Sequence, residues 1–240
     1  MRLNADFTRR AVVLPADYDW VPSPMPGVER MMLDRIGDEV ARATSLVRYA
    51  PNSEFSRHEH GGGEEFLVLE GVFSDEHGDY PAGCYVRNPI GTAHTPRIGP
   101  EGCTIFVKLH QFEPGDDRQF VVDTNSSPFA PSAREGIDVM ELHTFGDEQV
   151  AIVRWAPETS YVRHQHDSVE EVFVLKGSFT DEDGHYPEGS WIRSPAGSTH
   201  APVSGPDGAL VYIKLGQVTP QKKPAATTSQ RVKPGVSADR

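Results

Sequence analysis

The chain contains two copies of one sequence unit. Residues 58–109 align with residues 164–215 without a gap, at a constant offset of 106 residues, and 24 of the 52 aligned pairs are identical. After a three-residue change in length the match continues upstream, where residues 37–39 and residues 146–148 both read Gly-Asp-Glu. A repeat of this size indicates that each copy is one folding unit. At 240 residues the chain is long enough for two such units, each with its own core.

The repeat boundaries divide the chain into five predicted segments. Turn-forming Pro, Gly, Asp, Asn and Ser residues separate the two copies, which is typical of a linker. The last residues carry five Lys or Arg against one Asp and are rich in Ser, Thr, Ala and Pro, which is typical of an extended polar tail. The predicted segments are an N-terminal extension (1–19), a first domain (20–110), a linker (111–128), a second domain (129–216) and a basic tail (217–240).

Each copy consists of short β-rich runs punctuated by Gly, Pro, Asn or Asp, and no long amphipathic helix is visible. Many short strands with such turns predict an all-β fold, with a β-sandwich or small barrel of jelly-roll type in each half. The predicted strands span residues 44–49, 65–69, 84–87 and 104–109 in the first copy and residues 150–155, 172–175, 191–193 and 210–215 in the second.

Composition limits the classes of partner and compartment. The net charge of −12 opposes binding to nucleic acids and to anionic membranes. No stretch approaches the roughly 20 apolar residues of a membrane span, and the N-terminus lacks the apolar segment of a secretory signal. With only Cys84 and Cys103, a disulfide framework is excluded, and both are interpreted as small buried residues. We therefore expect a cytoplasmic protein, with a homodimer left open.

Four residues in each copy have the types and spacing of a metal site. His58, His60 and Glu64 have the same parity, so their side chains share one face of an extended chain, whereas Glu65 faces the other way. His94 follows after a series of Gly and Pro turn residues that can return its strand to the first. The second copy repeats the set at identical spacings as His164, His166, Glu170 and His200.

Three imidazoles and one carboxylate suit Fe(II), Zn, Mn, Ni or Cu better than Ca or Mg. We predict one divalent transition metal ion in each domain, with zinc or iron favoured over manganese or nickel. Four protein ligands leave one or two positions of a six-coordinate ion open for a substrate or O2.

Several cations also recur at matching strand positions. They are interpreted chiefly as ion-pair partners of Glu65 and Glu171 or of Asp75 and Asp181 on the outer surface. Aromatic residues at the strand ends are interpreted chiefly as packing residues. The recurring cations are Arg48/Arg154, Arg57/Arg163, Arg87/Arg193 and Lys108/Lys214, and the aromatic pairs are Tyr49/Trp155 and Phe106/Tyr212.

The motifs resemble the two signatures of the cupin superfamily. His-X-His-X3-Glu-X6-Gly begins at His58 and at His164, and Gly-X5-Pro-X-Gly-X2-His ends at His94 and at His200. Two copies resemble a bicupin, and the resemblance covers some 175 residues. The segment that starts at His58 is most similar to the cupin domain of ChrR-type anti-sigma factors. The helical sigma-binding domain of those factors, which uses His and paired Cys, has no counterpart in residues 1–19.

The resemblance implies two classes of function. Cupins with three His and one Glu include Fe(II)-dependent dioxygenases, which act on small chelating diketones, hydroxyketones or phenols. In ChrR-type proteins the same four residue types hold zinc, and the domain takes part in the response to singlet oxygen. We expect a metal-dependent enzyme of dioxygenase type with a small-molecule substrate, and a non-enzymatic zinc-binding sensor is the alternative.

Overall fold

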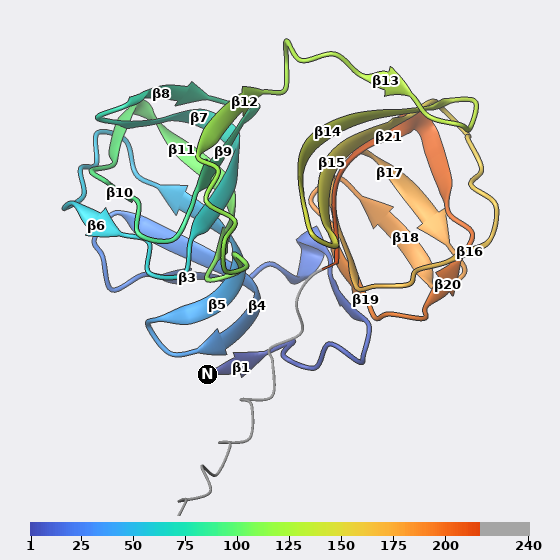
Figure 1. Ribbon diagram of the computed structural model, residues 1–240, viewed down its shortest axis with the longest axis horizontal. Coiled ribbons are helices and arrows are strands. Elements are labelled where there is room, and N and C mark those ends of the chain that lie inside the picture. Colours follow the sequence, from blue (N-terminus) through green and yellow to red (C-terminus); the bar gives the residue numbers. More distant parts are fainter. Residues whose placement is uncertain (217–240) are drawn as a thin grey trace, which may run out of the picture.

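The computed structural model describes residues 1–216, and the predicted basic tail lies outside the described residues. The first half of the chain forms a sheet that curls into a barrel (Figure 1). Its strands are β1 (Arg2–Leu3), β3 (Trp20–Pro22), β4 (Val28–Gly37), β5 (Ala41–Tyr49), β6 (His58–Glu59), β7 (Glu64–Asp75), β8 (Gly78–Pro81), β9 (Cys84–Asn88), β10 (Ala93–His94), β11 (Arg97–Leu109) and β12 (Phe120–Asp123).

The second half repeats this architecture. Its strands are β2 (Ala11–Val13), β13 (Ala130–Pro131), β14 (Ile137–Phe145), β15 (Glu148–Trp155), β16 (His164–Gln165), β17 (Glu170–Asp181), β18 (Gly184–Pro187), β19 (Trp191–Ser194), β20 (Thr199–His200) and β21 (Val203–Leu215). A single 3-10 turn, η1 (Pro15–Asp17), is the one helical element of residues 1–216. Within that range, no helix has the length and apolar character that crossing a bilayer requires.

The two sheets have equivalent strand orders. The first runs β1-β4-β5-β11-β7-β9-β12 and the second β13-β14-β15-β21-β17-β19-β2, and in each half a separate two-stranded ribbon joins the histidine-bearing strands. All of these pairings are antiparallel, with bulges in the long strands β7, β11, β17 and β21. The prediction of two tandem jelly-roll barrels is thus confirmed, and each predicted strand lies within an observed one.

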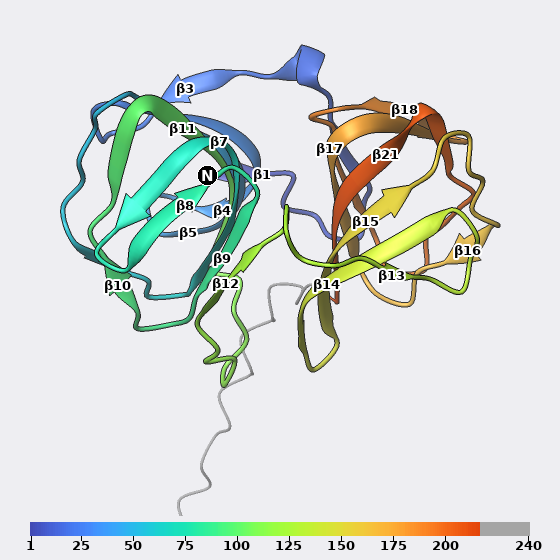
Figure 2. The same cartoon turned by 90° about the horizontal axis from the view of Figure 1, so that it is seen from above.

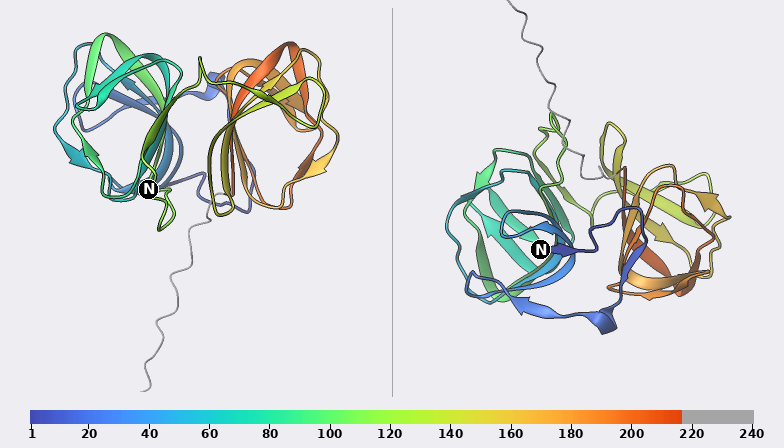
Figure 3. Two further views of the ribbon diagram at one scale, coloured as in Figure 1. Left: turned by 45° about the horizontal axis from the view of Figure 1, so that its top comes forward. Right: turned by 90° about the horizontal axis from the view of Figure 1, so that it is seen from below.

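The segments outside the repeat add strands to the barrels. The N-terminal segment starts on the first barrel with β1, crosses to pair β2 with β19 of the second, and returns through η1 to β3 (Figures 2 and 3). Residues 111–128 contribute β12, which pairs with β9. Both segments therefore take part in sheet pairing, although the domain boundaries themselves stay predictions.

Apolar side chains gather in three clusters. One lines the interior of each barrel, and the third lies between the barrels, where the outer faces of both sheets meet. At the centre of this interface Phe106 stacks on Phe173, with ring centroids 4.7 Å apart and planes 11° apart. Tyr212 contacts the same ring edge-on. Phe106 and Tyr212 are therefore packing residues between the barrels.

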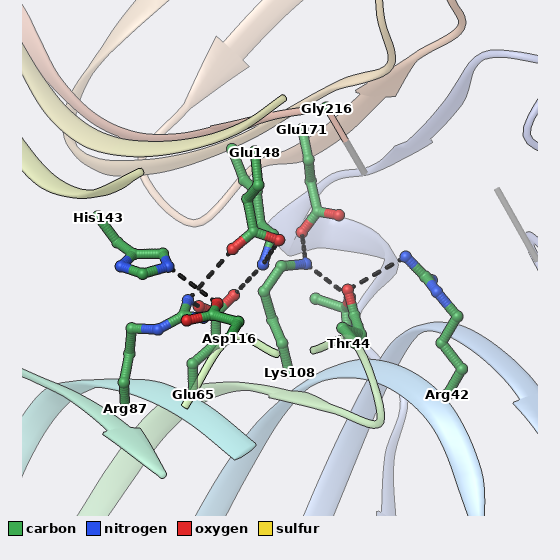
Figure 4. Close-up of polar contacts among 12 residues, drawn as sticks. Arg42, Thr44, Glu65, Arg87, Lys108, Asp116, His143, Glu148, Glu171 and Gly216 are labelled. Atoms are coloured by element: carbon green, nitrogen blue, oxygen red, sulfur yellow. Dashed lines mark hydrogen bonds and ion pairs between the residues drawn. The ribbon is translucent and has the colours of Figure 1, made fainter. Parts of the chain in front are cut away.

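A buried network of charges lies beside this apolar interface (Figure 4). Lys214 of the second barrel lies 2.6 Å from Glu65 of the first, and Lys108 of the first is bonded to Glu171 of the second. All four side chains are at most 1% exposed. The predicted ion-pair partners of these lysines are therefore right, but the expected location on the outer surface is wrong, because the pairs reach across the interface between the barrels.

Arg87 and Arg193 occupy equivalent places in this network. Arg87 is bonded to Glu65 and Asp116 and lies 3.2 Å from Glu148, and Arg193 lies 2.7 Å from Asp34. All of these groups are buried. Arg87 and Arg193 thus each have a carboxylate beside them, as burial of a charge requires.

The two lysines have different electrostatic environments. Burial lowers the pKa of Lys108, and its carboxylate neighbours offset this only in part. Burial also acts on Lys214, but Glu65 and Glu148 outweigh it, so the pKa of Lys214 is raised. Both carboxylates lie within 3.0 Å of the Lys214 ammonium. The neighbouring carboxylates therefore favour the charged form of Lys214 more than that of Lys108.

Candidate metal centres

The first centre is assembled by three short pieces of the first barrel. β6 and β10 form a ribbon in which His94 pairs directly with His58. The turn at residues 60–63 then leads into β7, which begins at Glu64, and Gly63 adopts a φ of +75° there that glycine tolerates at no steric cost. This turn brings the carboxylate of Glu64 to the ribbon. His60, Glu64 and His94 are buried, and His58 is exposed.

The four predicted residues of the first copy converge. One potential ligand atom from each of them lies within 4.8 Å of the others. The Nε2 atoms of His58 and His94 are 3.2 Å apart, and Oε1 of Glu64 lies 3.5 Å from Nε2 of His60 and 3.8 Å from Nε2 of His94. Glu65 has the opposite orientation and bonds Lys214 at the interface, as the parity of the strand predicts.

The other ring nitrogens are tied to the protein, which fixes how the rings lie. Nδ1 of His58 lies 3.2 Å from the carbonyl of Ser56, Nδ1 of His60 lies 3.0 Å from Oγ1 of Thr92, and Nδ1 of His94 lies 3.1 Å from Asp75. If Nδ1 carries the proton in each ring, the Nε2 lone pairs all face one another. Nε2 of His60 is buried without a hydrogen-bond partner. A cation among these lone pairs would satisfy them, so the residues fit a metal ion.

The second centre has the same construction. β16 and β20 pair His164 with His200, and Nε2 of His200 lies 3.0 Å from that of His166 and 3.2 Å from that of His164. Oε2 of Glu170, at the start of β17, lies 3.2 Å from Nε2 of His166 and 3.9 Å from that of His200. Nδ1 of His200 lies 3.4 Å from Asp181. The three histidines form the compact group, and Glu170 contacts two of them.

Burial shifts the pKa values of the histidines in the direction that favours metal binding and those of the glutamates in the opposite direction. It lowers the pKa of His60 to about 3 and that of His166 to about 4, with the neighbouring histidines adding to the effect. These imidazoles are therefore neutral near pH 7, the form that binds metals. Burial also raises the pKa of Glu64 and of Glu170 to about 7. A cation beside these carboxylates would favour their ionised form.

A cavity opens onto the second centre. It has a volume of about 430 Å³ and is bounded by all four predicted residues of the second copy. Its walls are mostly apolar, and Trp155 and Tyr161, which line it, are nearly parallel with centroids 6.3 Å apart. Trp155, interpreted from the sequence as a packing residue, thus also borders the site.

A third group of potential ligands lies at the interface between the barrels. Asp116, His143 and Glu148 are buried close together. The guanidinium of Arg87 bonds both carboxylates, and Nε2 of His143 lies 2.9 Å from Asp116. A positive charge already occupies this position, so we assign the group to the ion-pair network.

Sequence reasoning missed the contacts that orient the histidines. Asp75 and Asp181 are identical in the two copies, and the sequence favoured outer-surface ion pairs for them, yet they contact His94 and His200. Their recurrence at an equal distance before the last histidine of each set was the available signal. Thr92, which contacts His60, follows Gly91 of the second motif.

Comparison with known proteins places this geometry in a family. The family model described as the ChrR cupin-like domain matches residues 8–113 and again residues 117–219. None of the curated proteins that were compared matches the chain.

Several solved structures share the fold at low sequence identity. A proposed dioxygenase from Nostoc punctiforme has a TM-score of 0.69 at 15% identity, over 90% of this chain and 82% of its own. The pirin YhhW from Escherichia coli, in complex with nickel(II), has a TM-score of 0.65 at 15% identity, over 88% of this chain and 100% of its own. A variant of oxalate decarboxylase from Bacillus subtilis has a TM-score of 0.57 at 14% identity, over 86% of this chain and 77% of its own. At these identities the likeness shows the fold alone.

Proposed function

The chain belongs to the ChrR cupin-like domain family, and from this premise we propose that it is a metal-dependent enzyme of dioxygenase type. The proposed substrate is a small diketone, hydroxyketone or phenol that can chelate a metal ion. The observation that carries the proposal is the convergence of His164, His166 and His200, with Glu170 3.2 Å from His166, beside a largely apolar cavity that all four residues line. A fold shared with a proposed dioxygenase and with a nickel-bound pirin supports the same class.

Each residue of the proposed site has a defined task. The three imidazoles hold the ion through Nε2, and acceptors of the protein retain the Nδ1 atoms of His164 and His200. Glu170, which is buried at the start of β17, would balance the charge of the ion. When bound, a divalent transition metal supplies Lewis acidity that lowers the pKa of a chelating enol or phenol, and iron adds redox chemistry.

The apolar lining fits the substrate class. No Lys or Arg is among the residues that line the cavity, so it offers no countercharge to a permanently anionic substrate. A neutral molecule that loses a proton only on chelation fits better. Val153, Val172 and Val211 are among the apolar residues that line the same cavity as the histidines.

Elemental analysis of the protein, purified without added metal, tests the metal centres. We expect two equivalents of metal in the wild type and about one in His58→Ala and in His164→Ala. His77→Ala, which removes an exposed histidine outside both centres, is the matched control and keeps both equivalents. No loss in either ligand variant would contradict the assignment.

Oxygen uptake then tests the activity. Protein loaded with Fe(II) under anaerobic conditions is mixed with 1-phenylbutane-1,3-dione and air-saturated buffer. We expect O2 consumption that depends on the diketone and is lost in His164→Ala.

The second candidate is a zinc-binding sensor, which the family assignment favours. In that case the purified protein contains zinc, a redox-inert ion, and consumes no O2 with any chelating substrate. Metal identity and oxygen uptake together therefore separate the two functions.

A further inference from the structure

The two barrels differ at the residues that decide whether their interiors are open. Val172 and Val139 line the cavity of the second barrel. With the repeat offset of 106 residues, the position of Val172 is occupied by Phe66 in the first barrel. Arg30 pairs with Val47 across β4 and β5 in the same way that Val139 pairs with Val153 across β14 and β15. A large side chain thus replaces a valine twice in the first barrel.

Phe66 lies in the packed interior of the first barrel, and Arg30 is partly buried, with its guanidinium 3.8 Å from the exposed Glu39. Phe66 is 1% exposed and packs on Phe73, with ring centroids 4.8 Å apart. Arg30 donates a hydrogen bond to Ser23, and the serine at the equivalent place in the second barrel, Ser132, lines the cavity.

Two neighbouring residues are also more buried in the first barrel than in the second. Phe55 and Val107 are buried in the first barrel, whereas their counterparts Tyr161 and Ile213 are only partly buried and face the cavity. Two of the histidines follow this difference, because His60 and His94 are buried and their counterparts His166 and His200 are only partly buried, whereas His58 is exposed and its counterpart His164 is partly buried. The second barrel therefore has a chamber beside its centre, and the apolar interior of the first barrel is more closely packed.

We propose that the chain binds one organic ligand, in the second barrel only, and that Phe66 and Arg30 keep the first barrel closed to it. The ligand is a neutral molecule with a chelating head, which lies against the histidines, and a compact aromatic or branched apolar body. A cavity of about 430 Å³ lies within the usual range for small-molecule sites. Trp155 and Tyr161 offer their rings to the apolar body. The chelating head rests on the proposed function, but the closure of the first barrel does not.

Titration with 1-phenylbutane-1,3-dione tests the number and place of the sites. The zinc-loaded protein is used because zinc binds the diketone without turnover, and calorimetry gives the stoichiometry. We expect one equivalent per chain, and at least tenfold weaker binding in Val172→Phe, which places a phenyl ring in the chamber. Two equivalents in the wild type, or unchanged affinity in Val172→Phe, would overturn the proposal.

Phe66→Val is the matched control from the first barrel. This variant leaves the second barrel unchanged, so the diketone should still bind there with the affinity of the wild type. Loss of that binding would contradict the proposal. Both variants are expected to retain two zinc ions per chain, because neither residue is a proposed ligand. Quenching of Trp155 fluorescence by the diketone, absent in Trp155→Phe, locates the bound molecule in the second barrel.

Melting temperatures provide a readout that is independent of any metal. Filling a cavity that exists should leave the melting temperature of Val172→Phe unchanged or raise it, whereas Val68→Phe, in the filled first barrel, should lower it. A large fall in Val172→Phe would show that the chamber is closed and would overturn the proposal. If the protein holds no metal at all, the proposed function fails. Benzene binding to the metal-free wild type, but not to Val172→Phe, would still show that the chamber in the second barrel is open.

Discussion

In each candidate metal centre, one aspartate contacts Nδ1 of the last histidine and orients its ring. Asp75 contacts Nδ1 of His94 at 3.1 Å and also accepts hydrogen bonds from Tyr80 and from the turn at residues 77–78. Asp181 has equivalent contacts with His200 and Tyr186, and Arg10 pairs with it in addition. A histidine held this way presents Nε2 to the ion in one orientation and with raised basicity.

Asp75→Asn should therefore weaken zinc binding at the first centre by about 10- to 100-fold, because the ring loses its anionic partner. The affinity is measured by competition with a chromophoric chelator, in a His164→Ala background that isolates the first centre. Asp79→Asn, which changes an exposed aspartate that pairs with Arg97, is the control. An equal affinity in Asp75→Asn and the control would show that the carboxylate only supports the turn.

The sequence predicts which way a side chain points along a strand, but not the space that the side chain fills. Parity along β7 correctly separated Glu64, which lies near His60, from Glu65, which bonds Lys214. Alternation of side chains is a local property of a strand, so the sequence alone is enough to predict it. The role of Phe66 could not be predicted in the same way. A phenylalanine and a valine are equally apolar, and only the packed interior shows that one fills a space that the other leaves open.

At the scale of elements, the long strands β4 and β14 were missed by the sequence analysis. β4 carries Glu29, Arg30, Asp34 and Arg35 among its apolar residues, so its pattern is not that of a β-rich run. Asp34 is buried all the same, because it pairs with Arg193 of the other barrel. The burial of this strand depends on pairing with residues far away in the sequence, and a local sequence pattern cannot predict such pairing.

β2 is a second element that only long-range pairing defines. β2 occupies the edge of the second sheet, where it pairs with β19. Val13 is 9% exposed and belongs to the apolar cluster between the barrels, and Val12 is 39% exposed. The N-terminal segment thus closes a sheet edge and adds to the shared core.

Val13→Ala should lower the free energy of unfolding by about 1–3 kcal/mol, because it removes buried methyl groups from the shared core. Its neighbour provides the control, since Val12→Ala changes an exposed side chain and should stay within about 0.5 kcal/mol of the wild type. Chemical denaturation of both variants measures the difference. Equal stabilities would mean that β2 packs too loosely to contribute.

At the scale of the whole molecule, the two barrels are joined by an apolar contact and by reciprocal ion pairs. Phe106 and Phe173 stack at the centre, and each barrel sends a lysine to a glutamate of the other. Buried pairs of this kind cost desolvation and contribute little net stability, but breaking one leaves an uncompensated charge. Their arrangement therefore specifies how the barrels dock more than it stabilises them.

Lys108 and Glu171 allow that view to be tested. Glu171→Gln alone should lower the free energy of unfolding by about 3–5 kcal/mol, because the ammonium of Lys108 loses its bonded carboxylate in a buried site. Lys108→Met combined with Glu171→Gln should recover most of this loss, since no charge of the pair then remains. Denaturation of the two variants and of Lys108→Met completes a double-mutant cycle. Additive losses would contradict the interaction.

Stability should also depend on pH through His143 at the interface. Burial lowers the pKa of His143, Arg87 lowers it further, and the nearby carboxylates Asp116 and Glu148 offset this only in part. The unfolded chain therefore binds a proton near pH 6.5 that the folded chain binds only at lower pH. The free energy of unfolding consequently falls as the pH drops below about 6.5, by at most about 1.4 kcal/mol per pH unit for this one group.

His143→Gln keeps a polar group beside Asp116 but removes the titration. The difference in unfolding free energy between the wild type and this variant should shrink as the pH is lowered from about 7.5 to about 5.5, because only the wild type loses the contribution of His143. The metal-free proteins are compared, so that the remaining histidines titrate alike in both and cancel. A difference that is constant over this range would mean that His143 has the same pKa in the folded and the unfolded chain, and that the interface between the barrels does not respond to pH through this residue.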